Sequence, residues 1–339
     1  MELTYRKYDL ELIQEFTISN YSRKFTPTVL VELHQDGVTG YGEASMPQYL
    51  KENQDTVIQW LSNVKLKNIY SYDDLVDTLT DLNDRAIKNY PAIAAIDIAL
   101  HDLLGKLLNV PCYKFYGIIP KNDLFTSFTI GLADEKTLIS KIHAADKYKI
   151  LKIKLGAEND KQIIDTIRKI TDQKLFVDAN QGWKDKYFAL DMINWLSDKN
   201  AILVEQPMPV ANYEDTAWLK NRVSLPLIAD EAFQTVDNLD KIKDCYSGIN
   251  IKLMKCGGIY NAYNIVQKAK KNNLKVMLGC MTETSCGISA AKILSPLADY
   301  LDLDGNLLIQ NDPFGNEINS EGKLVINNLP GLGINKVEK

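Results

Sequence analysis

The sequence predicts an α/β protein that consists of a closed parallel β/α barrel and an α+β unit ahead of it. From about residue 122, short apolar β-type runs alternate regularly with helical stretches, as in a barrel. Before that point, strands come first and helices follow without alternation, as in an α+β unit. The chain has 339 residues, and because a barrel of this kind takes about 250, one barrel leaves a surplus for a second unit.

The N-terminal elements begin with a hairpin. Apolar segments at 28–33 and 40–44 flank a turn that contains Asp36-Gly37, and Asp-Gly between two such segments favours a tight hairpin turn. Apolar spacing then predicts helices over 55–68, 72–89 and 91–108, the last one ending near Pro111.

Eight apolar runs form the predicted barrel. Residues that mark the ends of the second to eighth strands are 22 to 27 positions apart: Lys154, Asp178, Glu205, Asp230, Lys252, Leu278 and Asp302. The runs are 125–130, 151–155, 175–178, 201–205, 226–230, 249–253, 275–278 and 300–303. An open doubly wound sheet is the alternative, but it would carry a glycine-rich phosphate loop that leads into a helix. Gly40-Tyr41-Gly42 leads into no helix, so we interpret it as part of the hairpin.

Composition and charge disfavour several classes of function. Apolar residues make up 45% and charged residues 24%, the formal net charge is −5, and no dense run of lysines and arginines is present. These features predict an ordinary globular protein and disfavour nucleic-acid binding. The first ten residues lack the apolar core of a signal peptide, and charged side chains interrupt the most apolar stretch, 91–108, so we expect no membrane span. Five cysteines without a CxxC pair favour reduced thiols in a cytoplasmic protein.

Three successive predicted strands end in a carboxylate, at Asp178, Glu205 and Asp230. A single Asp after an apolar run is usually a turn former or a helix cap, but three in register at the mouth of a barrel would repel one another unless a cation lay between them. An all-oxygen ligand set favours Mg²⁺, with Mn²⁺ as a substitute.

Lysines occupy the same register. In the run 151–155, alternation sends Lys152 and Lys154 to one face, and the aliphatic side chains to the other face, against the helices. The sixth run repeats the pattern with Lys252, and because the second and sixth strands of an eight-stranded barrel are opposed, Lys154 and Lys252 would face each other. Such a pair could remove a proton from a carbon acid on one side and return it on the other, with Mg²⁺ stabilising the enediolate.

The last run adds Asp302 and Asp304, again on one face. Turn formation before Gly305 is the simpler interpretation of these residues, and a clamp for a substrate ammonium is the functional one. Arg23 precedes the hairpin turn; it is either a solvated loop residue or, if its loop covers the barrel mouth, a bidentate ligand for a distal carboxylate.

The strand-end motifs, taken in order, resemble one known subgroup. Lys152-x-Lys154, Asp178-Ala179-Asn180, Glu205-Gln206-Pro207, Asp230-Glu231 and Asn250-Ile251-Lys252 resemble the muconate-lactonising subgroup of the enolase superfamily. Within that subgroup, Asp302-Leu303-Asp304 with Leu278-Gly279-Cys280-Met281 looks like the dipeptide epimerases, in particular the L-Ala-D/L-Glu epimerases.

The resemblance implies a modified (β/α)7β barrel over residues 121–305 and a capping domain over 1–120 that the tail 306–339 completes. It also implies a role for each site residue. Asp178, Glu205 and Asp230 would bind Mg²⁺, Lys154 and Lys252 would be the acid/base pair, Lys152 would act electrostatically, and Asp302 and Asp304 would bind the ammonium of a dipeptide. Arg23 falls near the position that contacts a glutamate side chain in some members, and Tyr21 and Lys24 compete with it for that role.

The predicted function is therefore Mg²⁺-dependent epimerisation of a dipeptide at its C-terminal residue, L-Ala-D-Glu to L-Ala-L-Glu in the recycling of murein peptides. The alternatives in the same subgroup are a cycloisomerase, an o-succinylbenzoate synthase and an N-acylamino acid racemase, none of which needs both Asp302 and Asp304. A barrel glycosidase would leave the opposed lysines without a role, and a binding barrel without catalysis would have no need of the whole set. The expected partner is a small dipeptide, with no nucleic acid and no membrane, and a homo-oligomer is compatible with the sequence.

Overall fold

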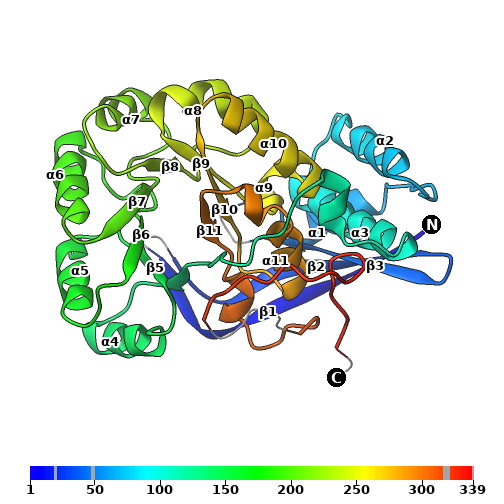
Figure 1. The fold of residues 1–339 in the computed structure, drawn as a ribbon, viewed down its shortest axis with the longest axis horizontal. Coiled ribbons are helices and arrows are strands. Elements are labelled where there is room, and N and C mark those ends of the chain that lie inside the picture. The colour runs from blue at the N-terminus through cyan, green and yellow to red at the C-terminus, as the bar shows by residue number, and fades with distance from the viewer. Residues whose placement is uncertain (19–20, 47–49, 316–320, 338–339) are drawn as a thin grey trace.

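The computed structural model describes residues 1–18, 21–46, 50–315 and 321–337. Figure 1 shows a barrel of strands ringed by helices and, beside it, a unit in which helices pack on an antiparallel sheet. Each part has its own buried apolar cluster. The two-part organisation that the sequence predicts is therefore confirmed.

The cap contains a three-stranded antiparallel sheet in the order β1 (Glu2–Ile18), β2 (Tyr21–Gln35) and β3 (Val38–Ser45). The β2–β3 turn is formed by Asp36 and Gly37, both with positive φ (52° and 77°), as the Asp-Gly signal predicts. The strand β1 was not predicted from the sequence, because most of its described side chains face solvent and only a few positions show the apolar alternation of a buried strand.

The cap contains the helices α1 (Gln54–Leu61), α2 (Tyr72–Asn83) and α3 (Tyr90–Leu107). Both α1 and α3 contact the sheet, and α2 packs on α3. The first two are shorter than predicted, since irregular segments follow them. The third has nearly the predicted bounds. It begins at the Asn89 cap with a proline in its first turn, and its C-cap residue is Leu108.

Gly40 and Gly42 set how closely α3 approaches the sheet. A Cβ at Gly40 would lie 2.3 Å from the Ala99 carbonyl oxygen, and one at Gly42 would lie 2.0 Å from that of Ala95. The Gly-Tyr-Gly segment therefore lies in a strand, as predicted, and its glycines provide room for the helix.

The barrel strands are all parallel and pair in sequence order. They are β4 (Phe128–Ile130), β5 (Ile150–Lys154), β6 (Lys174–Asp178), β7 (Ala201–Glu205), β8 (Leu227–Ala229), β9 (Gly248–Ile251), β10 (Lys275–Gly279) and β11 (Tyr300–Asp302). The helices are α4 (Glu135–Ala144), α5 (Asp160–Arg168), α6 (Lys186–Ser197), α7 (Tyr213–Lys220), α8 (Leu239–Cys245), α9 (Leu253–Cys256), α10 (Ile259–Lys271) and α11 (Ser285–Lys292). All eight predicted runs contain a strand, so the barrel prediction is confirmed.

Hydrogen bonds outside the strand ladder join β4 to β11. Ser127 N donates to the Leu301 carbonyl (3.0 Å), and the carboxylates of Asp302 and Asp304 accept bonds from Ser127 Oγ and Thr129 N, each 2.6 Å long. The predicted ammonium clamp therefore lies at the seam of the barrel.

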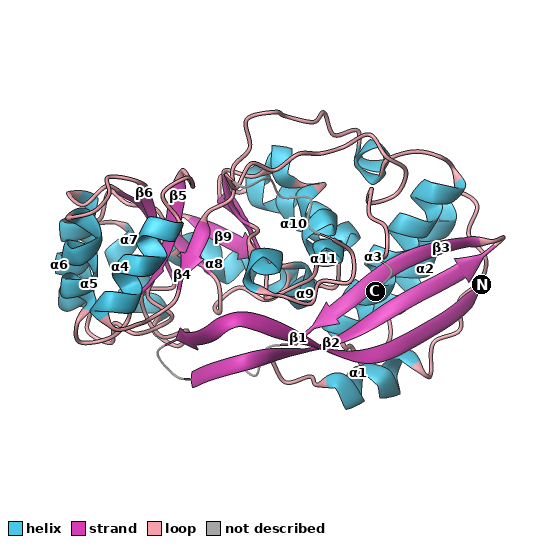
Figure 2. Ribbon diagram, turned by 90° about the horizontal axis from the view of Figure 1, so that it is seen from below, coloured by secondary structure: helices cyan, strands magenta, loops and turns pink. Residues whose placement is uncertain are grey.

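The C-terminal tail contacts both parts of the molecule. Leu332 N donates to Asp102 Oδ1 on α3 (2.9 Å), while Leu324 N donates to the carbonyl of Leu124, just ahead of the first barrel strand (2.9 Å). The predicted assignment of residues 306–339 to the cap stays a prediction. Figure 2 shows the far end of the β1–β2 hairpin extending beneath the barrel strands.

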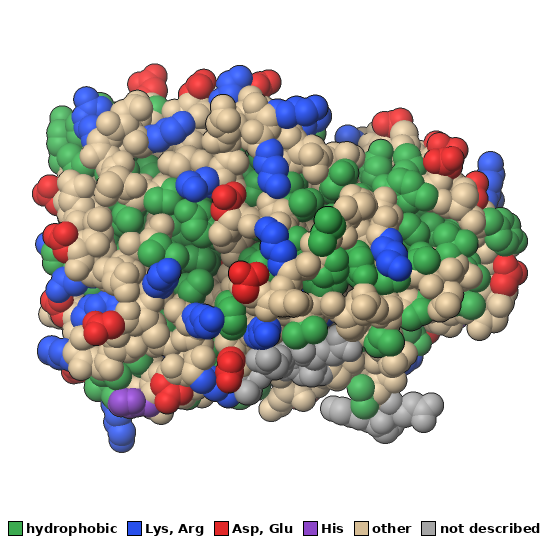
Figure 3. Space-filling view, viewed as in Figure 1, with side chains coloured by type: hydrophobic (Ala, Val, Ile, Leu, Met, Phe, Trp, Pro, Cys, Tyr) green, Lys and Arg blue, Asp and Glu red, His purple; other side chains and the backbone are tan. Residues whose placement is uncertain are grey.

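The surface and the cysteines agree with the composition. On the face in Figure 3, basic and acidic side chains are interspersed. All five cysteines are free thiols. Among the described residues, none of the helices combines the length and the apolar character that a bilayer crossing needs.

Candidate active site

Three carboxylates meet at the C-terminal ends of neighbouring barrel strands. Asp178 ends β6, Glu205 ends β7, and Asp230 directly follows β8. Asp178 and Glu205 are register partners in the ladder, so the fold itself places them side by side. All three are buried, and each offers an oxygen within 4.8 Å of the others. The structure thus brings together the predicted metal ligands.

Two lysines of β5 point into this cluster. Lys154 Nζ donates to Asp178 Oδ2 at 2.7 Å. Lys152 is 2% exposed, and its Nζ lies 2.6 Å from Glu205 Oε2, 2.7 Å from Asp302 Oδ2 and 3.3 Å from Asp178 Oδ2. Both side chains therefore face the barrel interior, as strand alternation predicts.

Lysines after β9 contact the same cluster through Asp230. Lys252 is the N-cap of α9, and its Nζ donates to Asp230 Oδ2 at 2.8 Å. One turn later, Lys255 Nζ donates to Asp230 Oδ1 at 2.6 Å and to the carbonyls of Asp230, Phe233 and Asn250. Lys255 was not predicted from the sequence, although its spacing of three from Lys252 on a helical turn is a signal that could have identified it.

Burial and the neighbouring lysines shift the pKa values of these carboxyl groups in opposite directions. Burial, and then the charge of Asp178, raise the pKa of Glu205 to about 7, although Lys152 opposes the shift. Burial also disfavours ionised Asp230, but the charges of Lys252, Lys255 and Lys152 outweigh it and hold the pKa of Asp230 well below its usual range. Burial opposes ionisation of Asp178 as well, and Lys154 and Lys152 lower its pKa overall. The cluster therefore needs cationic charge to ionise fully.

The donor set fits a hard divalent cation. Asp178, Glu205 and Asp230 offer carboxylate oxygens that lie within 4.8 Å of one another, with neither histidine nor cysteine among these three residues. Asn250 Nδ2 donates to Glu205 Oε1 at 2.7 Å, so one oxygen of Glu205 is fixed by a neutral group. Such a neighbour orients a ligand without competing for its charge.

Residues that follow the ligands have left-handed backbone conformations. Asn180 and Gln206 have φ values of 42° and 38°, in a region that non-glycine residues seldom adopt. Gln206 Oε1 accepts from Asp230 N at 3.1 Å, and Asn180 Nδ2 donates to Glu231 Oε1 at 3.2 Å. Burial, and then the charge of Asp230, raise the pKa of Glu231 to about 7. Glu231 contacts Asn180 and lies outside the ligand cluster that Asp178 forms.

The two aspartates of the last strand have different surroundings. Asp302 accepts from Lys152 and from Ser127 Oγ, so the protein already supplies it with a cation. Asp304 accepts from Thr129 N and forms no ion pair with a described residue. Burial, and then the charge of Asp302, raise its pKa to about 7.

Arg23 on β2 reaches the barrel. Its Nη2 donates to Thr282 Oγ1 at 2.8 Å, in the loop that follows β10. Lys24 is exposed, and the side chain of Tyr21 lies outside the described residues. Of the two candidates whose side chains the structure describes, Arg23 is the one that contacts the barrel.

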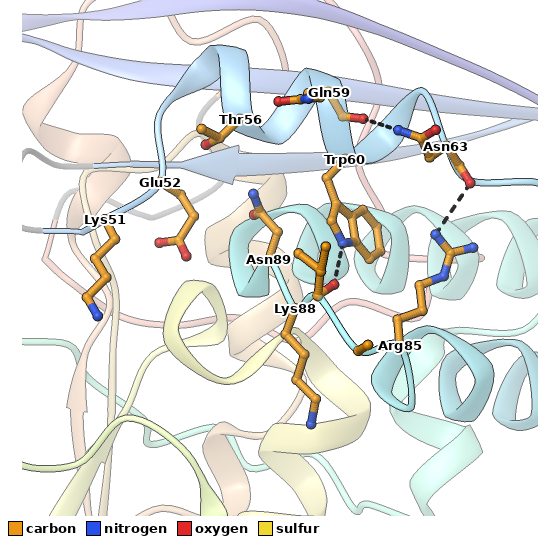
Figure 4. A pocket seen from close by; sticks show the side chains of 11 residues that line it. Lys51, Glu52, Thr56, Gln59, Trp60, Asn63, Arg85, Lys88 and Asn89 are labelled. Carbon is orange, nitrogen blue, oxygen red and sulfur yellow. Dashed lines mark hydrogen bonds between the residues drawn. The ribbon is translucent and has the colours of Figure 1, made fainter.

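Away from this site, a cavity of about 650 Å³ lies in the cap, between α1 and the loop that joins α2 to α3. Figure 4 shows two hydrogen bonds at this cavity: Trp60 Nε1 donates to the carbonyl of Ile87, and Arg85 Nη1 donates to the carbonyl of Asn63. None of the predicted site residues lines it.

Comparison with known proteins agrees with the fold and the site. A parallel barrel with carboxylates and lysines at its strand ends, under an α+β cap, defines an enolase-type barrel enzyme. Residues 3–117 match the model "Mandelate racemase / muconate lactonizing enzyme, N-terminal domain", and residues 136–339 match "Enolase C-terminal domain-like". The chain belongs to the mandelate racemase / muconate lactonizing enzyme family.

Three similar proteins are epimerases that act on dipeptides or L-Ala-D/L-amino acids. The L-Ala-D/L-Glu epimerase of Bacteroides thetaiotaomicron is 47% identical over 99% of this chain and 88% of its own length. The L-Ala-D/L-amino acid epimerase of Pedosphaera parvula is 39% identical, over 93% of this chain and 92% of its own. The dipeptide epimerase of Enterococcus faecalis, complexed with Mg and L-Leu-L-Tyr, superposes with a TM-score of 0.88 at 27% identity, over 98% of each chain.

Proposed function

We propose that this protein is a Mg²⁺-dependent dipeptide epimerase that inverts the α-carbon of the C-terminal residue. The observation that carries the proposal is the ion-paired cluster at the barrel mouth, where Lys154 and Lys252 each contact a different carboxylate of one metal-ligand set. The similar proteins of known activity support the same reaction.

Asp178, Glu205 and Asp230 would hold the metal ion. A bound Mg²⁺ supplies Lewis-acid stabilisation of the charge that develops on a substrate carboxylate when its α-proton leaves. With the positive charge of a metal ion at these carboxylates, the ion pairs of Lys154 with Asp178 and of Lys252 with Asp230 would be weakened.

Lys154 and Lys252 would then exchange protons with the substrate from opposite sides. One belongs to β5 and the other follows β9, four strands further along the eight-stranded order, and both reach the same carboxylate cluster. A divalent cation nearby lowers the pKa of a lysine, so that one of the pair can be neutral and act as the base.

Lys152 is suited to an electrostatic role. Burial alone would favour its neutral form, but the charges of Asp302, Glu205 and Asp178 outweigh burial and raise its pKa well above the usual value. Its ammonium form is therefore favoured, and it is positioned to stabilise negative charge near Glu205.

The dipeptide would be oriented by groups at the rim of the barrel. Asp304, with Asp302 behind it, would accept the N-terminal ammonium, and Arg23 would contact a carboxylate on the C-terminal side chain. This arrangement fits L-Ala-D/L-Glu, and we infer that the protein acts in murein peptide recycling in the cytoplasm.

Deuterium exchange tests the proposal. L-Ala-D-Glu and a panel of other dipeptides are incubated with enzyme and Mg²⁺ in D₂O, and NMR follows the α-proton of the C-terminal residue. Exchange accompanied by inversion is expected, and it should stop when EDTA removes the metal. Lack of exchange with every dipeptide would reject the proposed function.

Lysine variants separate the two bases. Lys154→Ala and Lys252→Ala should each abolish inversion, while one variant retains exchange of a single stereoisomer. Undiminished turnover in both would exclude the two-base mechanism. Lys270→Ala, which removes an exposed lysine of α10, is the matched control and should retain full activity.

A further inference from the structure

Two buried carboxyl groups face each other where the cap meets the barrel. Glu43 belongs to β3 of the cap, and Glu283 lies in the loop between β10 and α11; they are 0% and 1% exposed. A Cβ built on Gly287 would lie 2.4 Å from Glu283 Oε2 and 2.5 Å from Glu43 Oε1, so the two oxygens are at most about 5 Å apart. Neither residue forms an ion pair with a described residue.

The hydrogen bonds of Glu43 and Glu283 differ, and they indicate which of the two carboxyl groups is ionised. Glu43 Oε1 accepts from Thr284 N, Thr284 Oγ1 and Gly287 N at 3.0, 2.8 and 2.6 Å, so its carboxylate caps the N-terminal turn of α11. Donors of this kind favour negative charge. Glu283 Oε1 accepts from Met281 N at 2.8 Å, whereas its Oε2 is buried without a hydrogen-bond partner among the described residues.

Four further groups act on the pair electrostatically. Asp312 adds negative charge near Glu43, and Lys252 adds positive charge near Glu283. Each carboxyl also faces a thiol, Cys286 near Glu43 and Cys280 near Glu283. Lys252 is the one cation among these groups, and it already contacts Asp230, so two negative charges on the pair would be poorly compensated.

We propose that Glu43 and Glu283 share one proton at neutral pH, carried by Glu283 Oε2 and donated to the carboxylate of Glu43. Two adjacent buried carboxyl groups that share a proton avoid the repulsion of two like charges, and each fills the other's hydrogen-bonding need. Burial, with a smaller contribution from Asp312, raises the pKa of Glu43 to about 7. Burial and then the charge of Glu43 raise the pKa of Glu283 to about 8, which agrees with the proton residing on Glu283.

The pair positions the contact of Arg23. Thr282 lies between Met281 and Glu283, and the Glu283–Met281 bond closes a tight turn around it. Within that turn, Thr282 Oγ1 accepts from Arg23 Nη2, and the Thr282 carbonyl accepts from Ser45 Oγ of the cap. Holding Glu283 against Glu43 therefore fixes the surface on which Arg23 rests. Glu43 and Glu283 are thus positioning residues, and this consequence for the substrate rests on the proposed function, whereas the shared proton does not.

Infrared difference spectroscopy detects the proton directly. The spectrum of the wild type minus that of Glu283→Gln at pH 7 should contain the carbonyl stretch of a protonated carboxyl group, and this band should disappear at pH values well above 8. A wild-type spectrum without the band overturns the proposal. Should Glu283→Gln fail to fold, Gly287→Ala replaces it: the added methyl group would crowd both oxygens and should shift the band, because the hydrogen bond between the two carboxyl groups is lost.

Unfolding equilibria provide the second test. Wild-type Glu283 retains a proton that the unfolded chain has lost, so its contribution to stability decreases as the pH rises towards 8. Between pH 6 and 8, the ratio of the unfolding constant of the wild type to that of Glu283→Gln should rise by up to about tenfold per pH unit. A ratio that is independent of pH overturns the proposal. Thr282→Val is the control, since it removes the Arg23 contact and should leave the pH dependence as in the wild type.

Kinetics test the link to recognition. Above pH 8 the second charge should loosen the loop, so the wild-type KM for L-Ala-D-Glu should rise while kcat and the KM for L-Ala-L-Gln change little. Glu283→Gln should suppress this rise, and Thr282→Val should raise the KM at every pH. If the KM values do not differ in this way, the positioning role is wrong. Failure of the proposed function would be recognised separately, as no exchange with any dipeptide, and it would leave the spectroscopic and stability results intact.

Discussion

At the scale of single residues, the charge of each group in the site is compensated by several neighbours at once. Asp230 is shared by Lys252 and Lys255, one on each of its carboxylate oxygens. Lys255 also donates to three backbone carbonyls, so its ammonium group is fixed in place. We therefore expect Lys255 to stay on Asp230 when a metal ion binds, leaving Oδ2 as the ligand atom.

Lys255→Met tests this role. Without its partner at Oδ1, the carboxylate of Asp230 is free to rotate, and loss of such a neighbour typically weakens metal affinity about 10- to 100-fold. Titration of Mn²⁺ followed by electron paramagnetic resonance measures the change. The same substitution at the exposed Lys270 should leave the affinity unaltered, and an unaltered affinity in Lys255→Met would contradict the assignment.

Asp304 should control the pH dependence of substrate binding. Its pKa is raised to about 7, and an ammonium binds the ionised form, so the KM for a dipeptide should fall as the pH rises through 7. Asp304→Asn should raise the KM about 10- to 100-fold, the value of a charged hydrogen bond, and flatten this pH profile. An N-acetylated dipeptide lacks the ammonium, so it should not distinguish the variant from the wild type; if it does, Asp304 acts otherwise.

At the scale of elements, strand register assembles the site and glycine spacing determines how the cap packs. Lys154, Asp178 and Glu205 are successive register partners across β5, β6 and β7, so pairing of the strands suffices to align them. In the cap, α3 lies on β3 at a distance that only glycine at two positions permits.

Gly42→Ala should destabilise the cap because the new methyl group would lie 2.0 Å from a backbone oxygen of α3. Overpacking of this kind costs about 1–3 kcal/mol, which urea unfolding can measure. Gly117→Ala is the comparison, since Gly117 has a positive φ of 61° but no atom within 4 Å of the added group. It should cost about 1 kcal/mol through backbone strain alone. Equal losses in the two variants would show that close packing is not the cause.

At the scale of the whole molecule, buried carboxyl groups make the metal-free protein sensitive to pH. Glu205, Glu231 and Asp304 all have pKa values raised to about 7, mainly by burial. Between about pH 4.5 and 7 the folded chain keeps protons that the unfolded chain releases, so stability falls as the pH rises through this window. Asp178 and Asp230 have lowered pKa values, and their stabilising effect is lost only in more acidic solution.

Mg²⁺ should reverse this trend. The ion binds ionised carboxylates of the folded state, so it should raise the melting temperature more at pH 8 than at pH 5. Thermal melts with and without Mg²⁺ measure the difference. In Asp178→Asn the gain should be largely lost, and an equal gain at both pH values would contradict the charge balance described for the cluster.

The sequence alone determined the barrel and most of the site. A strand must bury one face, so alternation placed Lys152 and Lys154 inside the barrel, and the end of each apolar run located Asp178, Glu205 and Asp230 at its mouth. These are local patterns of period two, which the sequence shows directly. The Asp-Gly turn of the hairpin was visible for the same reason.

Only the tertiary structure decided the contacts between distant segments. The strand β1 has few buried side chains, and its partner sets its position. Lys255, Asn250 and the Glu43–Glu283 pair acquire their roles from neighbours that are far away in the chain. Hydrogen bonds and charge interactions depend on distances in space, and the charge of one buried group is set by all the others around it. The residue types at the site could thus be predicted, whereas their protonation and mutual support could not.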